Sequence, residues 1–140
     1  MNGERKAKWQ GMNWIRQSTR HAIYHRDGFA CVYCGRSEFV DGVRLTLDHV
    51  TAKELGGSDR SDNLVTCCGG VDGCNESKAD LSLRDWLRKL REERGVDTRK
   101  LGAKIRRHLR APLDCAAGRA IVAQKRAERC GTAVPTGVPF

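Results

Sequence analysis

The sequence predicts a small α+β fold, in which short strands are stapled by cysteine side chains and flanked by an N-terminal helix and basic C-terminal helices. The first observation is a run of short extended pieces over 29–50, where Leu45, Leu47 and His49 alternate with other residues in the period of a strand. The second is a set of amphipathic helical patterns that begins at residue 82. The third is a pair of cysteines on each side of the strand.

The length and charge of the chain indicate one compact domain, with an extension, and a polyanionic partner. It has 140 residues and a net charge of +9. Residues 1–30 hold six basic and two acidic residues, residues 31–83 five basic and nine acidic, and residues 84–129 fifteen basic and six acidic. A plain nucleic-acid-binding module has no need of an acidic centre, whereas an enzyme that holds a cation against a phosphate does.

The N-terminal part is predicted to be a basic arm followed by one helix. The arm covers residues 1–12, and the helix covers 13–27, with Asn13 as its N-cap and Gly28 as its stop. Residues 51–62 are rich in turn-forming side chains and are expected to form a loop.

The C-terminal half is predicted to be helical. A short helix opens over 74–80. Longer amphipathic helices are expected over 82–94, 98–110 and 114–129. In the first of these, Ser82 and Asp85 resemble a capping box and Gly95 ends the helix. The tail over 131–140, with two prolines and two glycines, is expected to be irregular.

Four of the seven cysteines are spaced as metal ligands. Cys31 and Cys34 form a C-x-x-C turn, and Cys68 and Cys74 are the best candidates for the second pair. Cys67 competes with Cys68, because adjacent cysteines point in different directions. A redox pair and unliganded core cysteines are the other interpretations. Four thiolates leave no open position on a tetrahedral zinc ion, so this zinc is expected to be structural.

The remaining features bear on location. No segment has the charged and apolar parts of a secretion signal, and no apolar run approaches about 18 residues. The protein is therefore expected to be cytoplasmic, with no membrane partner, and clustered cysteines there bind metal more often than they form disulfides. Cys115 and Cys130 are interpreted as ordinary small apolar residues.

Polar residues around the cysteine pairs complete a specific pattern. Its ordered motifs are Arg26-Asp27-Gly28, Cys31-x-x-Cys34-Gly35, Leu47-Asp48-His49-Val50, Gly56-Gly57, Asn63-Leu64-Val65 and Cys74-Asn75-x-x-Lys78. This combination resembles the HNH endonuclease family over roughly residues 20–80. The resemblance implies a ββα-metal core braced by a four-cysteine zinc, in a nuclease domain over 13–80. Residues 81–130 would then be a helical basic extension.

The resemblance also implies a role for each polar residue. His49 is expected to be the general base that takes a proton from water. Asp48 and Asn75 are expected to hold a catalytic Mg²⁺ or Mn²⁺ ion, which stabilises the phosphate and the leaving 3′ oxygen. Asn63 is expected to position the histidine and its loop.

Two departures from the family pattern stand out. Asn75 occupies the place where many members have a final histidine, so the set is an H-N-N version that keeps a metal-binding atom. Five residues separate Cys68 from Cys74, where family members often have two, which leaves the choice between Cys67 and Cys68 open.

Several residues have a plainer interpretation. Asp48-His49 alone is more often a surface turn than a catalytic pair, and Asn63 could be only a cap or turn residue. Lys78 is expected to contact a phosphate, with a solvated helix lysine as the alternative. The histidines expected to be ordinary surface or helix residues are His21, His25 and His108.

A nucleic-acid-binding surface is predicted on the helix over 98–110. Its basic side chains spread around one broad face and can neutralise phosphates without reading base sequence. They are Arg99, Lys100, Lys104, Arg106, Arg107 and Arg110. A solvated helix surface is the alternative interpretation.

Two functions compete at this point. One is a metal-dependent HNH endonuclease that nicks or cuts DNA, most simply double-stranded DNA. The other is a non-catalytic, zinc-stapled nucleic-acid-binding module. The complete set of Asp48, His49, Asn63 and Asn75 favours the nuclease. An RNA-directed nuclease, or a subunit that acts only with a partner, is a weaker idea. Many small proteins of this kind belong to phages, so the phage packaging machinery is a candidate protein partner.

Overall fold

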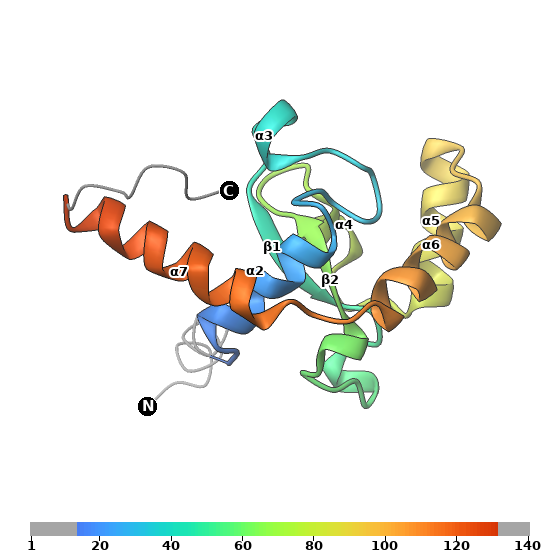
Figure 1. Cartoon of the computed structure of the whole chain (residues 1–140). Coiled ribbons are helices and arrows are strands. Elements are labelled where there is room, and N and C mark those ends of the chain that lie inside the picture. Colours follow the sequence, from blue (N-terminus) through green and yellow to red (C-terminus); the bar gives the residue numbers. More distant parts are fainter. Residues whose placement is uncertain (1–13, 132–140) are drawn as a thin grey trace, which may run out of the picture. The chain divides into compact units, whose positions relative to one another are not determined.

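The computed structural model describes residues 14–131 (Figure 1). The chain divides into two compact units, one made of Met1–Ala22 with Asp114–Phe140 and the other of Ile23–Leu113. The predicted arm over 1–12, the Asn13 cap and all but the first residue of the tail over 131–140 lie outside the described residues.

Two short antiparallel strands, β1 (Leu45–His49) and β2 (Leu64–Cys68), form the centre of the unit Ile23–Leu113. In their register Leu45 pairs with Cys68 and His49 pairs with Leu64. The alternation that predicts β1 is confirmed, since Leu45 and Leu47 are buried. No alternation predicts β2, because all five of its residues are buried and its sequence is a short apolar run.

The connections around the strands contain short helical turns. The predicted loop over 51–62 holds two 3₁₀ helices, η1 (Lys53–Leu55) and η2 (Ser61–Asn63). A four-residue helix, α3 (Glu38–Asp41), precedes β1 and is capped by the Ser37 side chain. The sequence pattern does not predict α3, since one turn of helix is too short to show a period.

The three helices that follow β2 agree with the sequence pattern. They are α4 (Cys74–Lys78), α5 (Leu83–Arg94) and α6 (Thr98–Arg110), and α5 and α6 lie side by side (Figure 1). Ser82 Oγ accepts a hydrogen bond from Asp85 N at 3.1 Å, and Gly95 ends α5 with a positive φ of 66°. Trp86 on α5 is fully buried in the same core cluster as the cysteines.

A buried carboxylate ties the end of α2 (Gln17–Arg26) to β2 and α6. Asp27 Oδ1 lies 2.8 Å from Arg26 Nε and 2.8 Å from His108 Nδ1, while its Oδ2 accepts from Thr66 N at 2.8 Å. His108 is a residue of helix α6, as expected, but its side chain also makes a contact that the sequence does not reveal. Its ring is only 23% exposed and joins α6 to the core through Asp27.

The other unit contains the N-terminal part of α2 and α7 (Cys115–Arg129). Asp114 caps α7 by accepting from Ala117 N at 2.9 Å. A Cβ atom at Gly118 would lie 2.2 Å from the Ser18 carbonyl oxygen, so only glycine allows the two helices to pack this closely. In the described part of the chain, no helix has both the length and the apolar character that crossing a membrane requires.

Candidate active site and metal centre

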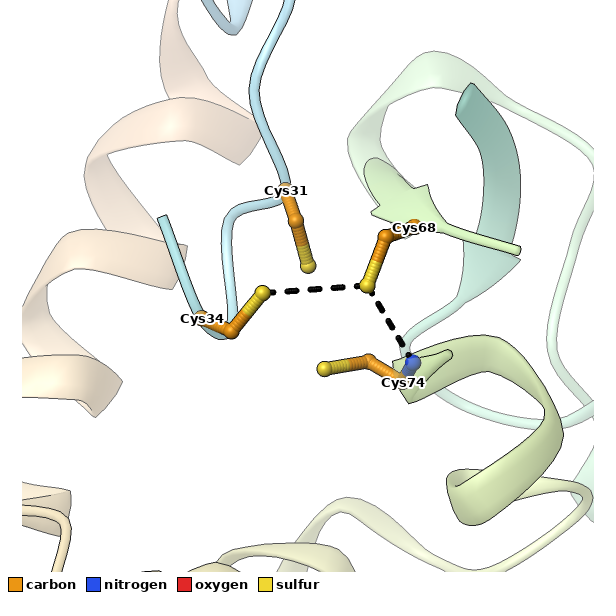
Figure 2. A group of neighbouring side chains, drawn as sticks. All are labelled: Cys31, Cys34, Cys68 and Cys74. Carbon is orange, nitrogen blue, oxygen red and sulfur yellow. Dashed lines mark hydrogen bonds between the residues drawn. The ribbon is translucent and has the colours of Figure 1, made fainter. Parts of the chain in front are cut away.

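Four cysteine side chains converge on one point, as Figure 2 shows. The sulfur atoms of Cys31, Cys34, Cys68 and Cys74 all lie within 4.8 Å of one another. The first two come from the turn before α3, Cys68 ends β2 and Cys74 begins α4. The group therefore joins the turn over 31–34 to the distant segment over 68–74, and it could hold a metal ion.

The structure also separates Cys67 from Cys68. Adjacent residues of a strand point to opposite faces, and it is Cys68 that belongs to the group. Cys67 stands outside it, with its thiol 3.7 Å from the Cys68 carbonyl oxygen. Cys68 Sγ also accepts a hydrogen bond from Cys74 N at 3.2 Å, so this sulfur binds the backbone of the first residue of α4.

The spacing and chemistry of the group fit zinc. A tetrahedron with Zn–S bonds of about 2.3 Å has edges of about 3.8 Å, and Cys34 Sγ lies 3.7 Å from Cys68 Sγ. Hydrogen bonds from the thiols of Cys34, Cys67 and Cys74 hold the pKa of Cys31 well below its ordinary value. The pKa of Cys74 is raised by its hydrogen bond to Cys31. Binding of a metal ion would deprotonate all four thiols, and the positive charge of the ion would offset the repulsion among the sulfurs.

Two arginines supply positive charge around the group. Arg36 Nε and Nη2 donate to Cys34 Sγ and Cys68 Sγ, each at 3.4 Å. Arg94 Nη1 donates to Cys74 Sγ at 3.2 Å, and its guanidinium carbon lies 5.7 Å from the centre of the Trp86 ring. A zinc ion with four thiolates has a net charge of about −2, which two guanidinium groups would balance.

A second constellation lies at the C-terminal end of β1. A pocket of about 230 Å³ is lined by Asp48 and His49 from the end of β1 and by Asn75 from α4. Three of the four residues predicted to form the active site thus share one pocket. Its remaining lining residues are Leu47, Ala52, Lys53, Glu54, Ala79 and Asp80.

Asp48 is a buried carboxylate with fixed partners. Its Oδ2 accepts a hydrogen bond from Tyr33 Oη at 2.5 Å and lies 3.2 Å from Lys78 Nζ. Burial raises the pKa of Asp48, and the positive charge of Lys78 acts in the opposite direction. Because both partners meet the same oxygen, Oδ1 is the oxygen through which Asp48 can reach a ligand in the pocket.

Lys78 differs from both interpretations offered by the sequence. Its side chain is 0% exposed, so it is neither a solvated helix lysine nor a surface contact for a phosphate. Besides the ion pair with Asp48, Nζ donates to the carbonyl oxygens of His49 at 3.0 Å and Leu81 at 3.3 Å. A buried ammonium needs such partners, and the pairing with Asp48 connects α4 to β1.

Asn75 presents its side-chain oxygen, because its nitrogen is occupied. Nδ2 donates to Thr46 Oγ1 at 2.9 Å and to the Leu47 carbonyl oxygen at 3.2 Å. A carbonyl oxygen can only accept a hydrogen bond, so the amide nitrogen must face Leu47. The Asn75 oxygen is then the atom that can meet a cation.

His49 has a carboxylate partner that the sequence pattern does not reveal. Its Nε2 lies 2.8 Å from Asp59 Oδ1, and the other oxygen of Asp59 lies 3.0 Å from Lys53 Nζ. The hydrogen bond with His49 lowers the pKa of Asp59, so this carboxyl stays ionised at neutral pH. In the sequence Asp59 belongs to a Gly-Gly-Ser-Asp segment. Aspartate is common in turns, so its presence there does not indicate a role beside His49.

Asn63 holds the loop that carries Asp59. Its Oδ1 accepts from Thr51 N at 2.9 Å, and its Nδ2 donates to the carbonyl oxygens of Thr51 at 3.0 Å and Ser58 at 2.8 Å. A Cβ atom at Gly57 would lie 1.7 Å from the Thr51 oxygen, so this close approach requires glycine. Asn63 is not among the residues that line the pocket.

Asp80 is a second residue that the sequence pattern does not single out. It lines the pocket together with Ala79, which has a φ of +48° although it is not a glycine. This unusual backbone conformation ends α4 and turns the chain so that Asp80 reaches the pocket.

The basic residues predicted on α6 are mostly at the surface. Arg99, Lys100, Arg106 and Arg107 are exposed, while Lys104 is half-buried. Leu101 and Ile105 on the same helix are buried, as the amphipathic pattern predicts. Cys115 and Cys130, in the other unit, are exposed free thiols.

Comparison with known proteins identifies the central segment. Residues 31–88 match a protein-family model described as HNH endonuclease. The matched segment contains the four clustered cysteines and the three residues predicted to line the pocket, which confirms the resemblance and the α+β core that it implies. Comparison with curated proteins and with solved structures gave no match.

Proposed function

We propose that this chain, whose residues 31–88 form an HNH endonuclease domain, is a metal-dependent nuclease that hydrolyses phosphodiester bonds of DNA. The observation that carries the proposal is the shared pocket of Asp48, His49 and Asn75 within that segment. A base, a carboxylate and an amide oxygen around one cleft are the groups that phosphodiester hydrolysis needs.

His49 acts as the general base in this proposal. Asp59 accepts the proton of Nε2, so a neutral imidazole has its lone pair on Nδ1, and that nitrogen takes the proton from water. Asn63 supports this arrangement indirectly, because it fixes the loop on which Asp59 stands. The histidine is thereby held in one tautomer and one orientation.

Asp48 Oδ1 and the Asn75 oxygen are the proposed ligands of a catalytic Mg²⁺ or Mn²⁺ ion. These are hard oxygen donors, which suit such ions. When bound, the ion supplies charge that stabilises the phosphate and the leaving 3′ oxygen. Lys78 already offsets the charge of Asp48, so the chain alone offers a weak cation site. Substrate phosphate is then expected to complete the coordination, as is usual for Mg²⁺.

The four-cysteine group is proposed to hold a structural zinc ion. Soft thiolates select zinc, and four of them leave no position for water or substrate. The exposed basic residues of α6, Arg99, Lys100, Arg106 and Arg107, together with Lys104, are proposed to contact phosphates of double-stranded DNA.

Plasmid nicking tests the proposal. Supercoiled plasmid is incubated with the wild type and with His49→Ala, in the presence of Mg²⁺, Mn²⁺ or no added divalent ion. We expect metal-dependent nicking that falls by at least about 10²-fold in His49→Ala, which is the scale of a lost general base.

The matched control is His25→Ala, since His25 is an exposed histidine outside the pocket. It should nick plasmid as the wild type does, and all three proteins should contain the same amount of zinc. Equal nicking by His49→Ala and the wild type would refute the role of His49. DNA binding without cleavage under every metal condition would favour a non-catalytic binding module instead.

A further inference from the structure

A groove on α5 presents three arginines on one side of the helix. It has a volume of about 450 Å³. Its lining residues are Leu83, Arg84, Leu87, Arg88 and Arg91 from α5 and Thr98 from the start of α6. The three arginines are exposed, and Leu83 and Leu87 are half-buried at its base. The groove therefore has a basic rim, an apolar floor and no acidic lining residue.

The arginines share one face because of their spacing. Arg84, Arg88 and Arg91 stand at positions i, i+4 and i+7, which a helix places in one row. With a rise of about 1.5 Å per residue, the row is about 10 Å long. The neighbouring face of α5 carries the buried residues Trp86 and Leu90, so the core holds the row in place.

These arginines are not needed for internal contacts, unlike others in the chain. Arg26 is bound to Asp27 and to two backbone carbonyls, and Arg36 and Arg94 donate to cysteine sulfurs. Among the described residues, the single ion pair made by the groove arginines joins Arg88 to Asp85 across 3.9 Å at the surface. Such an exposed pair contributes little to stability. The row is thus available to a ligand.

The charge and shape of the groove favour a phosphate backbone over an acidic protein. Guanidinium groups bind phosphate oxygens in pairs of hydrogen bonds, and the apolar floor suits the carbon atoms of a sugar. Protein interfaces usually combine arginine with Trp or Tyr anchors, and no aromatic residue lines the groove. Among the described residues, the exposed large apolar side chains Phe39, Val40, Leu55 and Val71 lie outside it.

The groove also begins close to the catalytic pocket along the chain. Asp80 lines that pocket, and Arg84 follows it by four residues within the same compact unit. Acidic side chains outnumber basic ones in the pocket, where Asp48, Glu54 and Asp80 face Lys53, whereas every charged side chain of the groove is basic. A polyanion would therefore be drawn to the groove rather than to the pocket itself.

We propose that the α5 groove binds the phosphate backbone of substrate DNA beside the bond that is cut. This inference rests on the proposed nuclease function and adds a binding surface to it. Each arginine is expected to neutralise about one phosphate and to release the counterions condensed there.

Salt-dependent DNA binding tests the groove without requiring cleavage. Binding of a short fluorescent duplex to the full-length, zinc-loaded His49→Ala protein is measured by anisotropy over a range of NaCl concentrations. The test variant adds Arg84→Gln, Arg88→Gln and Arg91→Gln. We expect the slope of log affinity against log salt to become shallower by about 2.7, which is about 0.9 for each lost phosphate contact.

Two further variants control for total charge and for folding. The first control carries Arg60→Gln, Lys125→Gln and Arg129→Gln in the His49→Ala protein, in place of the groove substitutions. These three residues are exposed and lie outside the groove, so replacing them removes the same amount of charge. This control should change the slope by less than about 1. The second replaces the groove arginines by lysine in the His49→Ala protein, and it should keep the slope of that protein because the charges remain. Circular dichroism and zinc content should be unchanged in all variants.

Equal slopes for the two glutamine variants would overturn the proposal, because total charge would then explain the binding. An unchanged slope in the groove variant would also overturn it, and would leave an acidic protein as the candidate for the groove. If plasmid is never cleaved but the groove variant alone has the shallower slope, the groove stands and the nuclease assignment falls.

Discussion

At the scale of single residues, the pairing of His49 with Asp59 shows how the proposed general base is held. The two atoms lie 2.8 Å apart, and Asp59 is in turn 3.0 Å from Lys53. The sequence motifs identify His49 but not Asp59. Asp59 lies ten residues further along in a turn, and no motif spacing connects it to His49. Asp59 is thus proposed as a positioning residue that acts through His49.

Replacing Asp59 by asparagine should slow catalysis without weakening DNA binding. Asparagine cannot supply the negative charge that holds the Nε2 proton, so the imidazole loses its preferred tautomer. We expect kcat for nicking to fall by about 10- to 100-fold while KM stays the same. Steady-state kinetics with a nicked-product assay measures both constants.

Asp62→Asn is the matched control, since Asp62 lies in the same loop and only pairs with Arg60 at the surface, 3.7 Å away. It should leave kcat and KM unchanged. A rise in KM with constant kcat in Asp59→Asn would show that Asp59 contributes to DNA binding and not to the position of His49.

At the scale of elements, the buried pair of Lys78 and Asp48 joins α4 to β1. Local signals predict the helix and the strand, but they do not predict that a lysine at the end of α4 has 0% exposure. Its burial follows from the packing of α4 across β1, where Nζ also reaches the His49 carbonyl oxygen. The same contact holds the backbone of His49, the proposed general base.

Lys78→Met should destabilise the fold strongly. It leaves the Asp48 carboxylate buried without its cation, and breaking a buried pair costs about 3–5 kcal/mol. Burial raises the pKa of Asp48, and the loss of Lys78 raises it further. A carboxyl with a raised folded-state pKa contributes stability at low pH that is lost as the pH rises. The deficit measured by urea unfolding should therefore shrink from about pH 8 to about pH 5.

Two companion variants make this test specific. Lys89→Met removes a lysine that donates to the Ser77 carbonyl oxygen at 2.9 Å without a carboxylate partner, so its smaller deficit should not depend on pH. Adding Asp48→Asn to Lys78→Met removes the orphaned charge and should restore part of the lost stability. A Lys78→Met deficit that is constant with pH would contradict the pairing.

At the scale of the whole molecule, the cysteine group lies within the small core and contacts several of the segments that form it. The buried cluster includes Trp86, Leu90, Leu101 and Ile105, so α5 and α6 pack against the cysteine region. The Trp86 ring also meets the Tyr33 ring edge-on, with centres 5.5 Å apart. In a core of this size, metal binding is expected to supply much of the folding free energy.

Removing zinc should therefore unfold the unit Ile23–Leu113. Trp86 reports on it, because the other two tryptophans, Trp9 and Trp14, lie outside this unit and can be replaced by phenylalanine. On addition of a chelator, Trp86 emission should shift to longer wavelength and helical circular dichroism should fall. Unchanged Trp86 emission after complete zinc loss would contradict the structural role.

Substitution of the arginines that contact the sulfurs adds a second arm to this chelator experiment. Arg36→Gln with Arg94→Gln removes the donors to three of the four sulfurs, so zinc should be lost at a chelator concentration about 10- to 100-fold lower. Arg60→Gln with Arg99→Gln removes the same charge at exposed positions and should lose zinc as the wild type does.

The sequence by itself determined the features that depend on local chemistry. The helix over 98–110 follows from a short-range apolar period, and the Cys31-x-x-Cys34 turn follows from its spacing. The ordered motifs also singled out Asp48, His49 and Asn75, which share one pocket, since a family pattern records a tertiary arrangement.

Only the tertiary structure decided the features that depend on contacts between distant segments. It chose Cys68 over Cys67, buried Lys78 against Asp48, and brought Asp59 to His49. It also paired β2 with β1. All five residues of β2 are buried, so its sequence has no alternation of apolar and polar residues to detect. In each case the deciding interaction is a partner far away in sequence, and neither propensity nor periodicity carries information about such a partner.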